Sequence, residues 1–187
     1  MAALLDVMFS IVLGSLFLLM ILAYNFDMVD ASHINNMYLN VQSTGIGFQE
    51  ILKYDLKKIG LGVSDSTVVF TIANTNQIKF KTDLDLDGSI NVVHYYTGDL
   101  SSADFTENPN DMLLYRKVDN NPVEHFSIGM TDIRFNYYDM DGNETAILAD
   151  IRHIGYSFYL ESTFAYDGEY PGIYIRGRIK PKNIKLN

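Results

Sequence analysis

An uncharged apolar run near the N-terminus limits what this chain can fold into more than any other feature. From Val7 to Tyr24 the sequence reads VMFSIVLGSLFLLMILAY and contains no Asp, Glu, Lys or Arg. An α-helix rises about 1.5 Å per residue, so this run is long enough to cross a hydrocarbon layer of about 30 Å. The sequence therefore predicts a membrane-spanning helix, or a helix built like one.

A single acid, Asp6, lies directly before this run. A carboxylate in an apolar segment costs on the order of 3 kcal/mol, so we expect it to have a positively charged partner. No Lys or Arg precedes Lys53, and the nearest cation along the chain is its amino terminus. The segment has neither the basic n-region of a secretory signal nor the basic flank of a cytoplasmic loop. One interpretation is that a basic leader is removed before Met1.

The rest of the 187-residue chain is long enough for one globular domain with its own core. The formal net charge is -9, which argues against nucleic acid or anionic lipid as a partner, because both require clustered Lys and Arg. The chain has no cysteine, so disulfides and thiolate metal sites are excluded.

Beyond the apolar run, an apolar stripe with helical period continues along the chain. Residues that repeat every seven places form two sets: Ile34, Val41 and Phe48, and Tyr38, Gly45, Leu52 and Ile59. The two sets lie four places apart, which is the spacing of one helix face. Charged residues are expected on the opposite side, namely Glu50, Lys53, Asp55 and Lys58.

A single helix is therefore predicted from Met1 to about Ile59. Gly60 and Gly62 supply the stop signals where the stripe ends. Gly45 and Gly47 each cost about 1 kcal/mol inside a helix, so a kink or a melted turn is the alternative there.

After Gly62 the apolar pattern changes to period two in short runs. Seven strands are predicted: Thr67–Ile72, Gln77–Lys81, Ile90–Tyr96, Met112–Val118, Ile133–Tyr138, Ile151–Leu160 and Gly172–Ile179. In the last strand Ile173, Ile175 and Ile179 share one face, which is typical of a sheet that is covered on one side. The amphipathic part of the helix is the natural cover.

The predicted fold class is α+β, with a long N-terminal α-helix packed on an antiparallel β-sheet. Residues 1–25 are expected to form the hydrophobic helix segment. Residues 26–187 are expected to form the globular domain, with the amphipathic helix at 26–60 and the sheet at 63–187.

Several motifs, in their order along the chain, resemble those of type IV pilin-like proteins. The segment NVQSTGIGFQEILKYDLKKIGLG is similar to a helix-end signature in which a Gln, a Gly, an apolar residue with "DLR", and "AG" recur. The matching positions are Gln42, Gly45, Ile51, Leu52, Asp55, Leu56, Lys57 and Gly60. The later motifs DLDLDGSINVVHYY, LLYRKV, DIRFNYYDMDGNE, IRHIGYSF and RIKPKNIKLN follow in the family's order. The chain most resembles the W-type minor pilins and the J-type pseudopilins of type II secretion.

This resemblance implies a structural subunit of a type IV pilus-like filament or of a type II secretion pseudopilus. Such a subunit resides in the bacterial inner membrane with its domain in the periplasm, and then joins an extracellular or periplasmic filament. The implied partners are inner-membrane lipid before assembly and, afterwards, other copies of itself or related pilin-like subunits; nucleic acid is not among them. The residues implied in assembly are Asp6, Val7, Phe9, Leu13, Leu16 and Met20.

Asp6 departs from the family pattern by one place. In the family a Glu sits fifth and is thought to neutralise the amino terminus of a neighbouring subunit, whereas the fifth residue here is Leu5. Asp6 becomes fifth only if Met1 is trimmed. Its predicted role is to set the axial register of the filament, because buried ion pairs add little strength after desolvation. The alternative is an interfacial acid without a partner.

The segment DLDLDG is the opening of a calcium loop. Asp83, Asp85 and Asp87 precede Gly88, and alternate carboxylates converge in such loops because the glycine lets the chain turn sharply. The position at which an EF-hand has its closing bidentate acid is His94, so the EF-hand prediction fails and another kind of calcium loop remains. The alternative is a plain solvated turn, since Asp-Gly turns are common by themselves. No other cofactor is expected.

Catalysis is not expected, because His33, His94, His125 and His153 are scattered and the common nucleophile, zinc and phosphate-binding motifs are missing from the sequence.

The basic C-terminal residues are Arg176, Arg178, Lys180, Lys182 and Lys185. They form either an edge strand protected against aggregation or a contact with the acidic residues 82–115 of a neighbouring subunit. The alternative to a filament subunit is a membrane-anchored periplasmic binding domain that never polymerises, with calcium as its candidate ligand.

Overall fold

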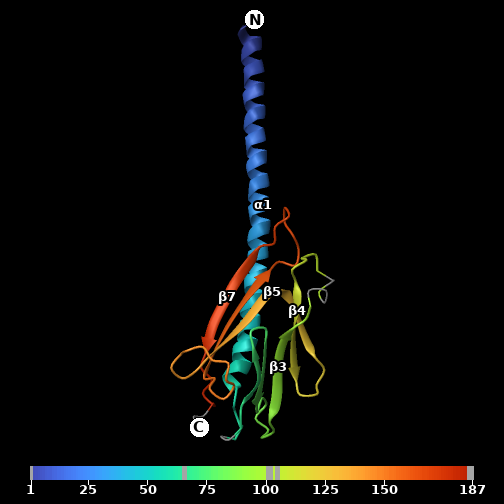
Figure 1. Ribbon diagram of the computed structural model, residues 1–187. Coiled ribbons are helices and arrows are strands. Elements are labelled where there is room, and N and C mark those ends of the chain that lie inside the picture. Colours follow the sequence, from blue (N-terminus) through green and yellow to red (C-terminus); the bar gives the residue numbers. More distant parts are fainter. Residues whose placement is uncertain (1, 65–66, 100–102, 104–105, 185–187) are drawn as a thin grey trace.

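The computed structural model describes residues 2–64, 67–99, 103 and 106–184. It consists of one helix, α1 (Ala2–Lys58), and a β domain built around the second half of that helix. The first half of α1 projects from one end of the domain (Figure 1). The predicted helix start at Met1, the basic residue Lys185 and part of the polar segment before Met112 lie outside the described residues.

α1 is a single helix of 57 residues, about 86 Å long at the standard rise. It continues through Gly45 and Gly47, so the prediction of one helix is confirmed and the alternative of a melted turn is wrong. Gly45 faces the domain, where a Cβ atom would lie 2.7 Å from Cδ1 of Ile175. Its missing side chain lets the helix approach the sheet closely, whereas Gly47 faces open space.

Two glycines end α1 as predicted. Gly60 and Gly62 have φ angles of +80° and +72°, a left-handed backbone conformation that favours glycine. The chain is hydrogen-bonded to the second strand at this point. The Gly60 amide donates to the carbonyl of Lys81 at 3.0 Å, and the Asp83 amide donates to the carbonyl of Leu61 at 2.8 Å.

Seven antiparallel strands form one sheet in the order in which they follow along the chain. They are β1 (Phe70–Asn74), β2 (Gln77–Thr82), β3 (Asn91–Thr97), β4 (Met112–Val118), β5 (Glu124–Tyr138), β6 (His153–Glu161) and β7 (Gly172–Ile179). Each predicted strand corresponds to one of them, and the predicted α+β fold class is confirmed. The largest difference is in β5, which begins at Glu124 rather than at Ile133.

β5 changes its partner half-way along. Up to Met130 it pairs with β4, and from Met130 onward it pairs with β6. Gly129 lies at this change with a φ of +72°, and a Cβ atom there would lie 2.0 Å from the carbonyl oxygen of Glu161. Beyond it, the Phe135 amide donates to the carbonyl of Thr75 in the β1–β2 turn at 2.7 Å. The first hairpin therefore bends towards β5, and the sheet curls around α1.

The core lies between one face of α1 and the inner face of this curled sheet. The helix contributes Val41, Phe48, Leu52, Leu56 and Ile59, and the sheet contributes residues such as Phe80, Val93, Tyr95, Leu114, Ile133, Phe135, Ile154 and Phe158. The upper end of the predicted stripe is not covered, since Ile34 and Tyr38 are 37% and 44% exposed. The amphipathic half of the helix thus covers the sheet as predicted, but the contact begins below these two residues.

Candidate functional site

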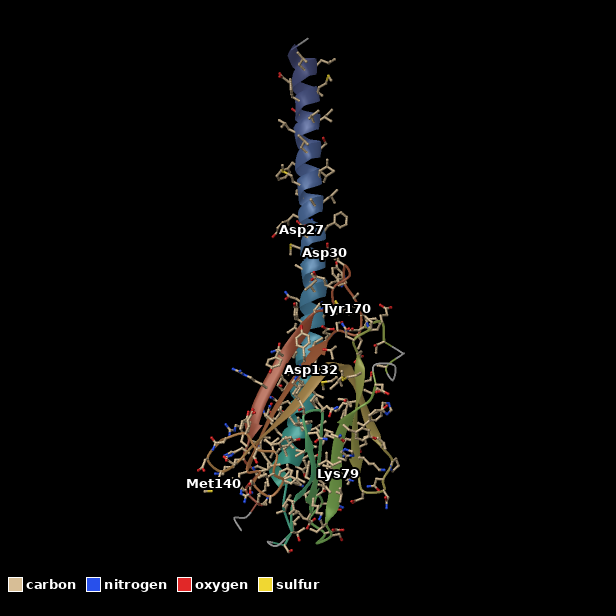
Figure 2. All side chains as sticks on the ribbon, in the orientation of Figure 1. Asp27, Asp30, Lys79, Asp132, Met140 and Tyr170 are labelled. Carbon is tan, nitrogen blue, oxygen red and sulfur yellow. The ribbon has the colours of Figure 1, made fainter. Side chains whose placement is uncertain are left out.

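The N-terminal half of α1 has no covering layer. Every large apolar side chain from Leu4 to Val29 is between 43% and 69% exposed. These side chains point away from the helix in all directions above the domain (Figure 2). The helix is long and apolar enough to cross a membrane, with a mean hydropathy of 2.5 in its most apolar window. Such a helix indicates membrane insertion or secretion.

The residues predicted to act in assembly lie mostly along one line on this bare helix. Asp6, Phe9, Leu13, Leu16 and Met20 follow one another at spacings of three or four residues, so they share a face. Val7 is next to this face and is also exposed. Asp6 is exposed as well, and none of the ion pairs between described residues includes it. The line therefore presents one acid followed by four large apolar side chains.

Exposure of this apolar surface to water is unfavourable. Full burial of a single Leu, Ile, Val, Phe or Met side chain is favourable by about 1.5–3 kcal/mol. Exposing all the apolar side chains between Leu4 and Val29 to water instead of burying them therefore costs on the order of tens of kcal/mol. The helix needs an apolar environment, which either lipid or other apolar helices supply.

The domain holds α1 just below the bare segment. The hydroxyl group of Tyr166, in the β6–β7 loop, donates to Asp30 Oδ1 at 2.5 Å, and the Tyr166 ring stacks on His33 with 5.9 Å between the ring centres. This loop extends from the sheet along the helix towards Asp30 (Figures 1 and 2). The β6–β7 loop thus contacts α1 at Asp30 and His33, above the point where the sheet begins to cover the helix.

A buried ionic network fixes the lower part of α1 to the sheet. Asp55 is only 1% exposed, and its Oδ2 accepts hydrogen bonds from Arg116 Nε at 2.7 Å and from the Tyr95 hydroxyl group at 2.6 Å. Arg116 also donates to the exposed Glu124 at 2.8 Å. Burial and the neighbouring Asp55 raise the pKa of Tyr95, which keeps its hydroxyl group protonated. Asp55 is therefore a structural anchor between helix and sheet.

The prediction that Asp55 lies on the polar side of the helix is wrong. Asp55 is three places after Leu52 and four before Ile59, so it belongs to the same face as these buried residues. The helical spacing by itself predicts that Asp55 lies in the core, but its charge led to the opposite prediction. Arg116, which compensates the charge, is distant in sequence and could not be identified as the partner from periodicity.

The predicted calcium loop lies between β2 and β3, beside the C-terminal end of α1. One carboxylate oxygen from each of Asp83, Asp85 and Asp87 lies within 4.8 Å of the other two. Asp83 is 7% exposed, whereas Asp85 and Asp87 are on the surface. The fold thus brings together the three carboxylates that the sequence singled out.

A second acidic turn, which contains Asp139, Asp141 and Glu144, lies between β5 and β6 and has a different arrangement. Asp139 Oδ1 accepts a hydrogen bond from the Asn143 amide at 2.9 Å. This bond, with further backbone and side-chain donors, holds the pKa of Asp139 below its usual range. The turn is stabilised by its own backbone, so Asp139 has the partners that its charge requires.

A buried acid ends the polar loop before β4. Asp111 is 1% exposed, and burial raises the pKa of its carboxyl group. Nearby, Asn108 joins this loop to β6, because its side-chain amide donates to Glu161 Oε2 at 2.8 Å. Asp111 was not singled out by the sequence, in which it is one of many acids in a polar stretch.

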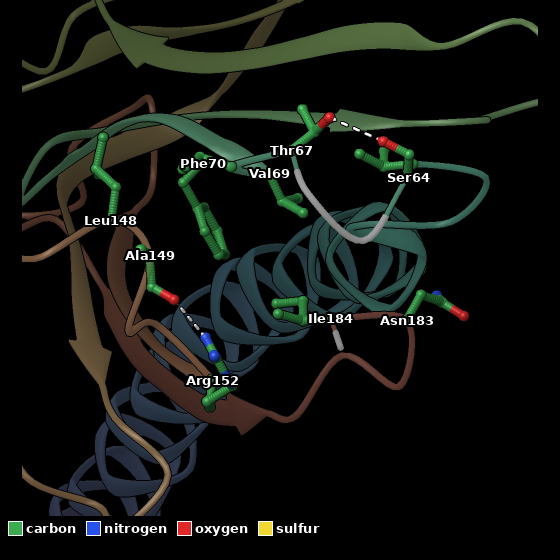
Figure 3. A pocket seen from close by; sticks show the side chains of 11 residues that line it. Ser64, Thr67, Val69, Phe70, Leu148, Ala149, Arg152, Asn183 and Ile184 are labelled. Atoms are coloured by element: carbon green, nitrogen blue, oxygen red, sulfur yellow. Dashed lines mark hydrogen bonds between the residues drawn. The ribbon is translucent and has the colours of Figure 1, made fainter. Parts of the chain in front are cut away.

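A small pocket lies between the end of α1, the start of β1 and the C-terminal segment (Figure 3). Phe70, Leu148 and Ile184 are among the apolar side chains that line it, together with polar groups. Arg152 is the one charged side chain among the described lining residues, and it donates to the carbonyl of Ala149 at 2.6 Å. The described lining therefore offers neither a nucleophile with a base nor a pair of carboxylates.

Comparisons with protein-family models, curated proteins and solved structures find no match to this chain. The description of the architecture as pilin-like is therefore based on the fold alone, which has a long apolar N-terminal helix whose second half packs against an antiparallel sheet.

Proposed function

We propose that this protein is a structural subunit of a type IV pilus-like filament or of a type II secretion pseudopilus. It resides in the bacterial inner membrane before assembly and has no catalytic activity of its own. Its partners are then other copies of itself or related pilin-like subunits, packed through Asp6, Val7, Phe9, Leu13, Leu16 and Met20.

The observation that supports this proposal most is the division of α1 into a bare half and a seated half within one continuous helix. A membrane anchor needs only a flexible connection to its domain. Here the apolar helix continues into the domain core without a break, and Asp55 and Tyr166 tie it to the sheet and to the β6–β7 loop. The domain is therefore held at a fixed orientation to the apolar segment, which regular packing of many copies requires.

Asp6 adds a second reason. A carboxylate beside an apolar run is costly in lipid, and its cost falls when it meets a positive charge between packed helices. We infer that Asp6 pairs with a cation of a neighbouring copy, and the resemblance to pilins indicates the amino-terminal group. Such a pair sets the axial register, while burial of the apolar side chains supplies most of the free energy of assembly.

The proposal is tested by Asp6→Ala in the native source, with filaments sheared from the cells and counted by electron microscopy. We expect the yield to fall at least about tenfold, which corresponds to about 1.4 kcal/mol of lost interaction. Asp6→Glu should retain assembly. Asp27→Ala is the matched control, because Asp27 is an exposed acid of the same helix that lies beyond the apolar run. A normal yield from Asp6→Ala, at equal protein level in the membrane, refutes the proposed role of Asp6.

The alternative is a membrane-anchored periplasmic binding domain that does not polymerise, and the acidic loop between β2 and β3 is the feature that favours it. In that case no filaments contain the protein, and neither Asp6→Ala nor Asp27→Ala changes its distribution.

A further inference from the structure

We propose that the loop Asp83–Gly88 binds one calcium ion and that the bound ion stabilises the junction between α1 and the sheet. The site is separate from the apolar helix face, so it is independent of the proposed role in filaments.

The three carboxylates have the geometry of a single cation site. Calcium binds oxygen ligands at 2.3–2.6 Å, so two oxygens on one ion lie at most about 5.2 Å apart. One oxygen from each of Asp83, Asp85 and Asp87 lies within 4.8 Å of the other two, so the three fit one ion with little movement. Carboxylate and carbonyl oxygens are also the ligands that calcium prefers.

The burial of Asp83 is a second, independent indication that this loop binds a ligand. Its carboxyl group faces into the loop, because Oδ2 accepts a hydrogen bond from the Gly88 amide at 3.1 Å. The other oxygen, Oδ1, is buried and has no hydrogen-bond partner among the described residues. A buried carboxylate oxygen without a partner is costly, and the ordinary remedies are a donor or a cation. No donor among the described residues reaches Oδ1, and none of the ion pairs between them includes Asp83, so a bound cation would satisfy this oxygen.

The expected affinity is low. An EF-hand gains much of its affinity from a bidentate acid at the twelfth position, where this chain has His94. His94 Nε2 instead forms a hydrogen bond with Gln77 Oε1 on β2, at 3.1 Å. Asp87 also uses one oxygen, Oδ1, to accept from the Ser89 amide at 2.7 Å. Water must complete the coordination, so we expect a Kd of about 0.1–1 mM, as in extracellular calcium modules.

The position of the loop explains what the ion does. The Asp83 amide donates to Leu61 just after α1, the Thr82 hydroxyl group donates to the carbonyl of Lys58 at 2.7 Å, and Lys58 Nζ donates to the carbonyl of Leu84. Three hydrogen bonds thus join the loop and the end of β2 to the last turn of the helix and the residues just after it. A cation that fixes the loop also fixes the end of α1 against β2.

The test is thermal unfolding of the full chain in detergent micelles, with near-ultraviolet circular dichroism as the signal. At 10 mM CaCl2, roughly thirty times a Kd of about 0.3 mM, we expect Tm to rise by about 4–8 °C. NaCl of the same ionic strength serves as the control for screening. Isothermal titration calorimetry with CaCl2 should give one site per chain.

Two pairs of substitutions separate the site from general charge effects. Asp85→Asn with Asp87→Asn changes two exposed side chains, so the fold should persist, and the calcium-dependent rise in Tm should disappear. Asp139→Asn with Asp141→Asn removes the same charge from the second acidic turn and should leave the rise unchanged. The proposal is overturned if the unaltered protein shows no rise, or if the Asp85 and Asp87 variant keeps it. Because detergent-solubilised protein is used, either result is independent of whether filaments form.

Discussion

Asp55→Ala should destabilise the domain more than any other substitution of a charged residue on α1. Asp55 is 1% exposed and is the shared acceptor for Arg116 Nε and the Tyr95 hydroxyl group. Its removal leaves a guanidinium group and a hydroxyl group without their acceptor at the interface between helix and sheet. The free energy of unfolding should therefore fall.

The magnitude follows from these contacts. Removal of one partner from a buried ion pair costs about 3–5 kcal/mol, and a buried hydroxyl group left without an acceptor costs about 1–3 kcal/mol. The two costs do not add fully, because both bonds end on the same oxygen atom of Asp55. Arg116 keeps its bond to Glu124 and is 13% exposed, so water relieves part of the loss. We expect a decrease of about 3–4 kcal/mol.

The assay is urea unfolding of the full chain in detergent micelles, followed by near-ultraviolet circular dichroism. A double-mutant cycle with Arg116→Met measures the coupling, since replacing both partners leaves no uncompensated charge. The control is the exposed pair Asp132 and Arg134, whose Oδ2 and Nε atoms are 3.0 Å apart. Asp132→Ala should cost no more than about 1 kcal/mol.

Two results would contradict this reasoning. The first is a loss of less than about 1 kcal/mol for Asp55→Ala, which is the range of a surface pair. The second is additivity of Asp55→Ala and Arg116→Met, which would mean that the two side chains do not interact in solution.

Two further predictions concern the helix glycines and the buried acid. Gly47→Ala should raise the free energy of unfolding by about 0.5–1 kcal/mol because Gly47 is helical and faces open space, whereas Gly45→Leu should lower it by about 1–3 kcal/mol because its side chain would collide with Ile175. Urea midpoints measure both, and equal effects at the two positions would contradict the packing of α1 on β7. Burial raises the pKa of the Asp111 carboxyl group in the folded protein above its value of 3.8 in the unfolded chain. The contribution of Asp111 to the free energy of unfolding is therefore fully present below pH 3.8 and is lost as the pH rises through the pKa of the folded state. Asp111→Asn should therefore flatten the dependence of the urea midpoint on pH above 3.8, and an unchanged slope would contradict the assignment.

The features that depend on local periodicity could be predicted from the sequence. The long helix follows from an apolar run joined to an amphipathic stripe without a proline, and its end follows from Gly60 and Gly62. The strands follow from short period-two runs, and the three acids of the loop from their alternation before Gly88. In each case neighbouring residues determine the local structure by themselves.

The features that depend on distant residues could not be predicted. Helical spacing places Asp55 on the buried face, but its charge argues against burial until the position of Arg116 is known, and Asp111 gives no sign in the sequence that it is buried. The first part of β5 was not predicted, and within it Gly129 allows the strand to change partners beside Glu161. Burial of a charge and a change of strand partner are decided by tertiary packing, which periodicity does not report.

The most direct test of the central claim is helical reconstruction by electron cryomicroscopy of filaments from the native source. The account predicts filaments in which residues 7–24 of neighbouring copies pack against one another along the axis, with the β domains outside and Asp6 next to a positive charge of another copy. Protein that stays in the membrane fraction without filaments, or filaments whose axis is formed by other parts of the chain, would contradict it.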